Sequence, residues 1–286
     1  MSARLKSTIG LDVGGTRIRA ARVTQDGEML HHLVEPVVSD RTGFVNQVLR
    51  LINTVRDETT CGVGIGIPGR VMGGTGQIVT AGYLDIDGLE LPDLVRTKTQ
   101  LPCQTMNDAA MALIAEGRGS SGLVAMITVG TGVGGALLLD GIPYHGGDFA
   151  GQFGHIVVAA DGPKCNCGRR GCVETFSAGP ALGALIAKAG FPQSTTAAGI
   201  IEAAANGDDK ANDVMAAWAA PMERALQTLI AVVDPTRIIF GGGLGIDMAR
   251  IITARNKRSA WFDRPIVPAR WGDNAGVIGA GLAGFL

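Results

Sequence analysis

Short apolar runs that end in glycine recur along the chain and give the first outline of its fold. They read IGLDVGG (residues 9–15), VGIGIPG (63–69), MITVGTGVGG (126–135) and IIFGGGLG (238–245). Each run is typical of a strand followed by a tight turn, where bare backbone approaches a neighbour closely. Because the alternating stretch RIRAARV follows the first run, we expect a hairpin turn from Asp12 to Thr16 between two strands.

Between these runs, apolar residues recur at the spacing of helices, so the pattern predicts an α/β fold. A small-residue stretch over 275–286 predicts a last helix, and Pro221 predicts a break or kink in a long one. The other expected helices cover 44–58, 109–119 and 211–233. The expected packing anchors are Trp218, Trp261 and Trp271.

Length and charge narrow the function. With 286 residues the chain exceeds what one ordinary core organises, so we expect two lobes. The formal net charge is -1 with acids and bases interleaved, which gives no basic surface for a nucleic acid. No apolar run approaches the roughly 20 residues that span a bilayer, and the first residues lack the apolar stretch of a secretory signal. We therefore expect no membrane partner and a cytoplasmic location.

The glycine turns are candidate nucleotide sites, because several inward-pointing backbone N–H groups hold a triphosphate best. The first turn adds Asp12, which can hold Mg²⁺ directly or through water, and the hydroxyl of Thr16. The second adds the hydroxyl of Thr131, and the third offers bare backbone to an adenine ring. An ordinary hairpin explains one such turn equally well, but three favour ATP, and neither a P-loop nor a Rossmann fingerprint is present. The candidate residues are Asp12, Gly14, Gly15, Thr16, Thr131, Gly132, Gly242 and Gly243.

A second candidate site lies in HIVVAADGPKCNCGRRGC, residues 155–172, with the pattern H-x9-C-x-C-x4-C. Three thiolates and one imidazole complete a tetrahedral set that suits Zn²⁺, and the closed set predicts a structural ion. Cysteines one residue apart do not bridge easily, and the cytoplasm disfavours disulfides. The remaining thiols, Cys61 and Cys103, read as inert strand residues. The predicted ligands are His155, Cys165, Cys167 and Cys172.

The stretch TMNDAAMALIAEG places Asn107 and Asp108 at the end of a strand and the start of a helix. Both residue types cap helices well, and capping alone explains them. A carboxylate there is also a candidate base for a substrate hydroxyl, so both interpretations stay open at this point.

In order along the chain, LDVGGT, GIPG, NDAAMAL, TVGTGVGG, GHIVV, CNCGRRGC and FGGGLG resemble the ROK family (repressors, open reading frames, kinases). The resemblance covers nearly the whole chain. It implies the two-lobed actin/hexokinase-like (ribonuclease H-like) ATPase fold, an α/β fold with a central nucleotide cleft. It also implies a small domain of residues 1–110 joined by the helix at about 272–286, and a large domain of 111–271 with the zinc loop. ROK repressors carry a helix-turn-helix before the first glycine turn, and here residue 12 comes too early for one.

The resemblance assigns roles to single residues. Asp108 matches the aspartate that accepts the proton of the sugar hydroxyl, and Asn107 matches a hydrogen-bond partner of the ring. His155 matches a residue that holds zinc with one ring nitrogen and a sugar hydroxyl with the other. Two positions depart from the family: Gln152 replaces the glutamate of AGE-x-GH, and Tyr83 replaces the asparagine of an Asn-Leu pair. The implied sugar contacts are Gly69, Asn107, Gln152, His155 and Glu174.

The resemblance, together with the glycine turns, implies a carbohydrate kinase that uses ATP and Mg²⁺ and phosphorylates a hexose or N-acetylhexosamine at its 6-hydroxyl. Glucose is the favoured sugar and N-acetylmannosamine the alternative. A sugar-responsive binding protein without turnover is the competing class, and an actin-like polymerising ATPase, which needs no zinc loop, is the third. ROK kinases commonly pair, so the resemblance implies a homodimer.

Overall fold

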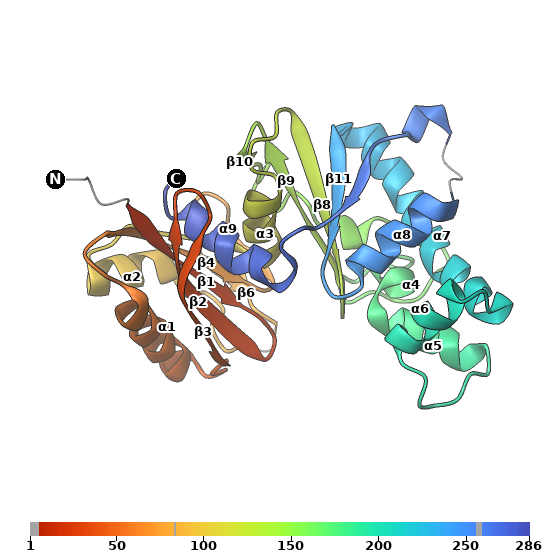
Figure 1. Ribbon diagram of the computed structural model, residues 1–286, viewed down its shortest axis with the longest axis horizontal. Helices are drawn as coiled ribbons and strands as arrows, with labels where there is room; N and C mark the ends of the chain where they lie inside the picture. The colour runs from red at the N-terminus through yellow and green to blue at the C-terminus, as the bar shows by residue number, and fades with distance from the viewer. Residues whose placement is uncertain (1–5, 83, 256–258) are drawn as a thin grey trace. The chain divides into compact units, whose positions relative to one another are not determined.

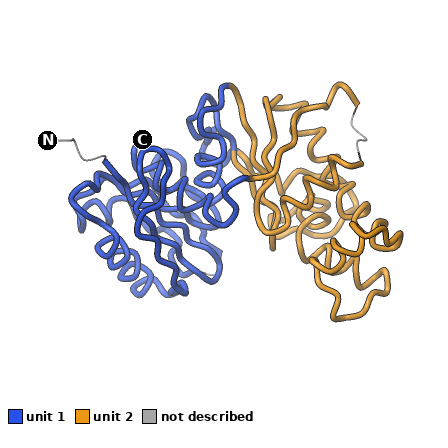
Figure 2. Tube along the Cα trace, viewed as in Figure 1, with its two compact units in different colours: residues 1–121, 137–150, 270–286 blue, residues 122–136, 151–269 orange. Residues whose placement is uncertain are grey.

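The computed structural model describes residues 6–82, 84–255 and 259–286 (Figure 1). The chain forms two compact units, shown in separate colours in Figure 2. Unit 1 consists of residues 1–121, 137–150 and 270–286, and unit 2 of residues 122–136 and 151–269. The domain division expected from the sequence, with a boundary at residues 110 and 111, stays a prediction.

Unit 1 is built on a five-stranded sheet of order β3-β2-β1-β4-β7. Strands β1, β2 and β3 pair antiparallel, whereas β4 pairs parallel with both β1 and β7. The strands are β1 (Ser7–Val13), β2 (Arg17–Thr24), β3 (Met29–Pro36), β4 (Thr60–Ile67) and β7 (Cys103–Asn107). The helices are α1 (Arg41–Val55), α2 (Leu91–Thr99), α3 (Asp108–Glu116) and α9 (Ala275–Ala283), and η3 (Gly272–Asn274) is a short 3₁₀ turn. A separate small sheet pairs β5 (Arg70–Val71) with β6 (Ile78–Thr80).

Alternation along β1 sends its side chains to two different layers. Ile9, Leu11 and Val13 are fully buried in the same core cluster as Phe44 of α1. On the other face the Thr8 hydroxyl donates to the carbonyl of Gly281 in α9. Figure 1 shows α9, in blue, lying across the red strands of this sheet. The last helix of the chain thus completes the first sheet.

In-strand glycines make room for that helix. A Cβ atom on Gly10 would lie 2.0 Å from the Val277 carbonyl oxygen, and one on Gly64 would lie 1.9 Å from that of Ala280. The expectation that VGIGIPG ends in a turn is met at Gly69, but Gly64 serves the packing of a helix. A glycine within a strand indicates that another segment approaches the backbone closely, but it does not indicate which segment. The sequence therefore could not identify α9 as the neighbour of Gly64.

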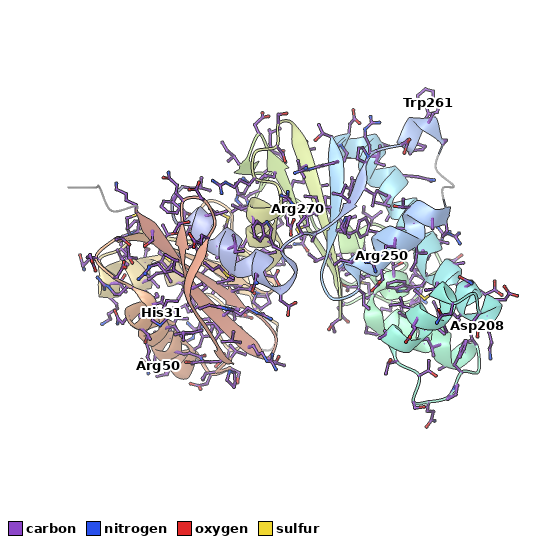
Figure 3. All side chains as sticks on the ribbon, viewed as in Figure 1. His31, Arg50, Asp208, Arg250, Trp261 and Arg270 are labelled. Carbon is purple, nitrogen blue, oxygen red and sulfur yellow. The ribbon has the colours of Figure 1, made fainter. Side chains whose placement is uncertain are left out.

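A buried carboxylate fixes the segment that leads into α9. Glu116, at the end of α3, accepts hydrogen bonds from the backbone N–H of Arg270 at 2.8 and 2.9 Å and of Trp271 at 2.8 Å. Arg270, labelled in Figure 3, also places its Nε 3.7 Å from the same carboxylate. These donors replace water around a charge that would otherwise be costly to bury.

Unit 2 contains most of a second five-stranded sheet of order β10-β9-β8-β11-β12. Strand β11 pairs parallel with β8 and β12, and β9 pairs antiparallel with β10. The strands are β8 (Leu123–Val129), β9 (Val133–Leu139), β10 (Ile142–Pro143), β11 (Arg237–Gly241) and β12 (Ile266–Pro268). The helices and 3₁₀ turns are η1 (Phe153–His155), α4 (Glu174–Ser177), α5 (Gly179–Lys188), α6 (Ala197–Ala205), α7 (Asp209–Val233), α8 (Gly245–Arg255) and η2 (Ala260–Phe262). The end of β9 and all of β10 belong to unit 1.

Two expectations about packing are wrong. Helix α7 continues through the buried Pro221, so the expected break is wrong, whereas the alternative of a kink at this residue stays a prediction. Trp218 is the expected anchor, fully buried with its Nε1 donating to the Ala178 carbonyl at 3.2 Å. Trp261, labelled in Figure 3, is 85% exposed, and Trp271 is 44% exposed, so neither anchors a core. The sequence shows where the tryptophans are but not which segments pack against them. Of the three, only Trp218 lies on a buried face of a helix.

The mixed sheets and helices confirm the predicted α/β class. In the described part of the chain, no helix has the length and apolar character needed to cross a bilayer.

Candidate functional site

The predicted site residues fall into two groups, one in each unit. Unit 1 carries Asp12, Gly14, Gly15, Thr16, Gly69, Asn107 and Asp108. Unit 2 carries Thr131, Gly132, Gln152, His155, Cys165, Cys167, Cys172, Glu174, Gly242 and Gly243.

The first glycine turn joins β1 to β2 as the expected hairpin, and the Gly14 N–H donates to the Arg17 carbonyl at 2.8 Å. Asp12 and Arg19 face each other across the two strands. The Arg19 Nη1 lies 3.5 Å from the Asp12 Oδ2, and its Nη2 donates to Asp273 at 3.2 Å. The sequence did not point to Arg19, because only the register of β1 against β2 places it opposite Asp12.

Asp12 and Asp108 form an acidic pair in unit 1. Burial and the neighbouring Asp108 carboxylate raise the pKa of Asp12 to about 6, against the lowering effect of Arg19. Burial raises the pKa of Asp108 to about 6 as well, and the Ala109 N–H opposes the rise. Desolvated carboxylates that repel one another attract a divalent cation, so the pair suits Mg²⁺.

Asn107 and Asp108 lie where the sequence predicted, at the last residue of β7 and the first of α3. The Asn107 Oδ1 caps α3 by accepting from the Ala109 N–H at 2.9 Å, while its Nδ2 donates to the Gly69 carbonyl at 2.8 Å. Capping is thus one real role of Asn107. The Asp108 Oδ1 accepts from the same N–H at 2.8 Å, and part of the residue remains exposed. An orienting bond and an accessible carboxylate are what a general base needs.

The second and third glycine turns meet at one edge of the sheet in unit 2, because β8 and β11 run parallel side by side. The Leu244 N–H donates to the Val129 carbonyl at 2.9 Å. Gly242 has φ +80, and a Cβ atom there would lie 2.6 Å from that carbonyl oxygen. No atom lies within 4 Å of a Cβ placed on Gly130 or Gly243, so these turns offer open backbone. Such backbone suits phosphate or a flat ring.

Glu174 ties helix α4 to the second turn. Its Oε2 accepts from the Val133 N–H at 2.9 Å and lies 2.7 Å from where a Gly132 Cβ would be. A pocket of about 190 Å³ places Glu174 beside Thr131 and the cysteine loop. The residues that line it are Thr131, Lys164, Cys165, Asn166, Glu174, Thr175, Ala178, Pro180 and Ala181. Lys164 and Thr175 were not foreseen, since only three-dimensional packing brings them to Thr131.

The four predicted metal ligands come together, and their ligand atoms all lie within 4.8 Å of one another. The Cys167 and Cys172 Sγ atoms are 3.6 Å apart, as are the Cys165 Sγ and the His155 Nδ1. A tetrahedral zinc ion places two sulfurs about 3.8 Å apart and a sulfur and a nitrogen about 3.6 Å apart. The donor set and its spacing therefore fit Zn²⁺, and every described cysteine is unbridged.

Glycines and backbone bonds shape this loop. Gly168 and Gly171 have φ values of +89 and +74, and a Cβ atom on Gly171 would lie 1.6 Å from the Ala159 carbonyl oxygen. Arg169 donates to the His155 carbonyl at 3.0 Å and, through its backbone N–H above all, lowers the pKa of Cys167 to about 7. Burial raises the pKa of Cys172 to about 12, so a bound cation is needed to hold its thiolate.

Gln152 is exposed, directly before η1, and no side-chain hydrogen bond caps that turn. A Cβ atom on Gly154 would lie 2.0 Å from the Val133 carbonyl oxygen, so the sequence AGQFGH needs its second glycine. Tyr83, the other departure from the family pattern, lies outside the described residues. Cys61 in β4 and Cys103 in β7 are strand thiols, as expected.

Comparison with known proteins gives consistent matches over the full chain. A model of the ROK family matches residues 8–283. The N-acetylmannosamine kinase of Yersinia pseudotuberculosis serotype O:1b (strain IP 31758) is 29% identical over 96% of this chain and 97% of its own. A ROK family glucokinase from Streptomyces griseus, solved with glucose and AMPPNP, is 29% identical with a TM-score of 0.79, covering 98% of this chain and 99% of that one.

A third match concerns the fold alone. A ROK family transcriptional regulator, a homolog of the Escherichia coli MLC protein, is 22% identical with a TM-score of 0.85, covering 98% of this chain and 78% of that one. Together the matches confirm the predicted fold class.

Proposed function

The chain belongs to the ROK family, and from that membership we propose that it transfers the γ-phosphoryl group of ATP to a hydroxyl of a hexose or N-acetylhexosamine. The 6-hydroxyl is the proposed acceptor. The kinase names of its relatives support the reaction class, and the sugar is the finer part of the proposal.

The open glycine turns of unit 2 are the proposed ATP-binding backbone, with Thr131 as a hydroxyl donor. In unit 1, Asp12 would hold Mg²⁺ directly or through water, and Thr16 would donate to a phosphate oxygen. Bound Mg²⁺ would neutralise charge on the phosphates, which is the principal need of a loose phosphoryl-transfer transition state. Arg19 of β2, which also donates to Asp273, keeps the Asp12 carboxylate oriented.

The proposal rests on the position and protonation behaviour of Asp108. This residue is oriented by the Ala109 N–H, partly exposed, and raised in pKa to about 6, so it is ionised yet basic near neutral pH. As the sugar oxygen forms its bond to phosphorus and the bond to ADP breaks, Asp108 takes the hydroxyl proton. Asn107, fixed by two hydrogen bonds, would present its remaining hydrogen-bonding capacity to the sugar ring.

His155, Cys165, Cys167 and Cys172 would hold a structural Zn²⁺. When bound, the ion would supply rigidity, because its closed ligand set leaves no position for substrate. Because His155 turns Nδ1 toward Cys165, its Nε2 is left as the proposed donor or acceptor for a sugar hydroxyl. Glu174, the second residue after the last ligand, is the companion sugar contact in this proposal.

Glucose is the favoured acceptor and N-acetylmannosamine the alternative. The relatives named above include a kinase for each. Gln152 is compatible with either sugar. Its uncharged amide both donates and accepts hydrogen bonds, so it suits the N-acyl group of N-acetylmannosamine as well as a hydroxyl of glucose.

The test is a panel of hexoses and N-acetylhexosamines assayed with ATP and Mg²⁺, followed by Asp108→Asn. The variant should lose about 10²–10⁴-fold in kcat and still bind the sugar that the wild type phosphorylates, measured by calorimetry. Asp208→Asn is the matched control, because Asp208 caps α7 and asparagine caps equally well. A wild type that binds a sugar but phosphorylates none would replace the kinase by a sugar-binding protein.

A further inference from the structure

The β5–β6 hairpin begins at a predicted substrate residue. Gly69 precedes Arg70 with φ +97, and a Cβ atom on Gly69 would lie 2.3 Å from the Thr80 carbonyl oxygen. Because the Gly69 carbonyl accepts from the Asn107 Nδ2, the base of the hairpin is joined to the strand end that carries Asp108. The hairpin is therefore anchored beside the proposed acceptor residues of unit 1.

The hairpin contacts one further segment of unit 1, residues 145–150, at three points. The Arg70 Cζ lies 3.9 Å from the centroid of the Phe149 ring. The His145 side chain packs on Gly73 so closely that a Cβ atom there would lie 2.4 Å from it. The Gly74 N–H points to the Asp148 Oδ1 at 3.5 Å. We call these three contacts the hairpin clasp.

The clasped segment is strained and leads directly to a predicted sugar contact. Asp148 has φ +97, a backbone region that a residue with a side chain enters at a cost of about 1–3 kcal/mol. Such a conformation persists only where contacts hold it. Two residues after this segment comes Gln152, and the next turn, η1, ends in His155.

We propose that the hairpin clasp fixes the base of the hairpin at Gly69, and through its carbonyl the side chain of Asn107, for the acceptor sugar, with Arg70 and Phe149 as positioning residues for the sugar and not for ATP. The inference rests on the proposed function. Within unit 1 the clasped hairpin begins directly after Gly69, and the Gly69 carbonyl accepts from Asn107, so the clasp adjoins two predicted sugar contacts. None of its residues adjoins a glycine turn assigned to the nucleotide.

Steady-state kinetics and sugar binding in the absence of ATP test the clasp with Arg70→Met and Phe149→Leu. Each variant should raise the KM and the Kd for the sugar about 2–5-fold, which is what a partly exposed cation–π contact is worth. The KM for ATP should stay unchanged. Arg70→Lys keeps a cation over the ring and should stay within twofold of the wild type. The double variant should be no weaker than either single one, because both remove the same contact.

Lys210→Met is the matched control. It breaks a second cation–π pair, in which the Lys210 Nζ lies 4.5 Å from the Phe191 ring centroid in unit 2, and it should leave both KM values unchanged. An unchanged sugar Kd, additive losses, or a parallel rise in the KM for ATP would each overturn the clasp. A wild type inactive on every sugar would instead overturn the proposed function, so the two failures are distinguishable.

Discussion

At the scale of single residues, the state of Asp108 predicts how activity depends on pH. The general base must be ionised, and burial raises its pKa to about 6. kcat/KM should therefore fall by at least about tenfold per pH unit below pH 6 and level off above pH 7. Asp12 titrates in the same range, so the measured midpoint belongs to the pair. A pH–rate profile checks this, and a midpoint near 4 would contradict the assignment.

The same pKa shift has a consequence for stability. A carboxyl group with a raised pKa in the folded state favours folding while it is protonated. That contribution is present below about pH 4 and is lost as the pH rises through about 6. Above pH 6 the ionised Asp108 therefore opposes folding, and Asp108→Asn should stabilise the protein by about 1–2 kcal/mol at pH 8. Thermal melts of both forms at pH 8 and pH 4 test the sign, since the gain should vanish at pH 4.

At the scale of elements, the cysteine loop should depend on its ion. Purified protein should contain about one zinc per chain, and Cys172→Ser should lose it and melt at a lower temperature. Chelator treatment of the wild type should reproduce both effects. Cys61→Ser is the control, because Cys61 is a half-buried thiol in β4 outside the cluster. Full zinc content in Cys172→Ser would remove Cys172 from the ligand set.

Helix α9 gives a second prediction at this scale. Gly64→Ala would force a methyl group to within 1.9 Å of the Ala280 carbonyl oxygen, so it should destabilise unit 1 by about 2–3 kcal/mol or more. Gly183→Ala is the opposite case, because Gly183 lies in helix α5 with no atom within 4 Å of an added Cβ. That substitution should stabilise by about 0.5–1 kcal/mol. Denaturant unfolding of both variants measures the two effects.

The first hairpin turn and the metal loop were predictable because they rest on local rules, whereas helix ends were less so: the helix expected over 44–58 runs from Arg41 to Val55. The hairpin at Asp12–Thr16 follows from alternation and glycine, and the clustering of the four ligands follows from their spacing. Long-range pairings were not predictable. Arg19 beside Asp12 needs the strand register, and Arg70 over Phe149 needs two segments about 80 residues apart to meet.

At the scale of the whole molecule, the sequence predicted two lobes and a last helix that returns to the first sheet. It did not predict that the chain would pass between units inside β9. Side chains alternate in the same way along the whole of a strand, so the sequence of β9 contains no signal for the point at which the chain passes from one unit to the other. The expected homodimer and the cytoplasmic location stay predictions, the first open to light scattering of the purified protein.

The return of α9 to the first sheet bears on synthesis of the protein. Translation produces β1 and β4 about 200 residues before α9, so the part of the sheet at Gly10 and Gly64 lacks its covering helix while those residues are being made. Domains that emerge whole can fold on the ribosome, whereas unit 1 has to wait. A stop codon between residues 270 and 275 would leave Gly10 and Gly64 permanently without that helix, although all of unit 2 would have been translated.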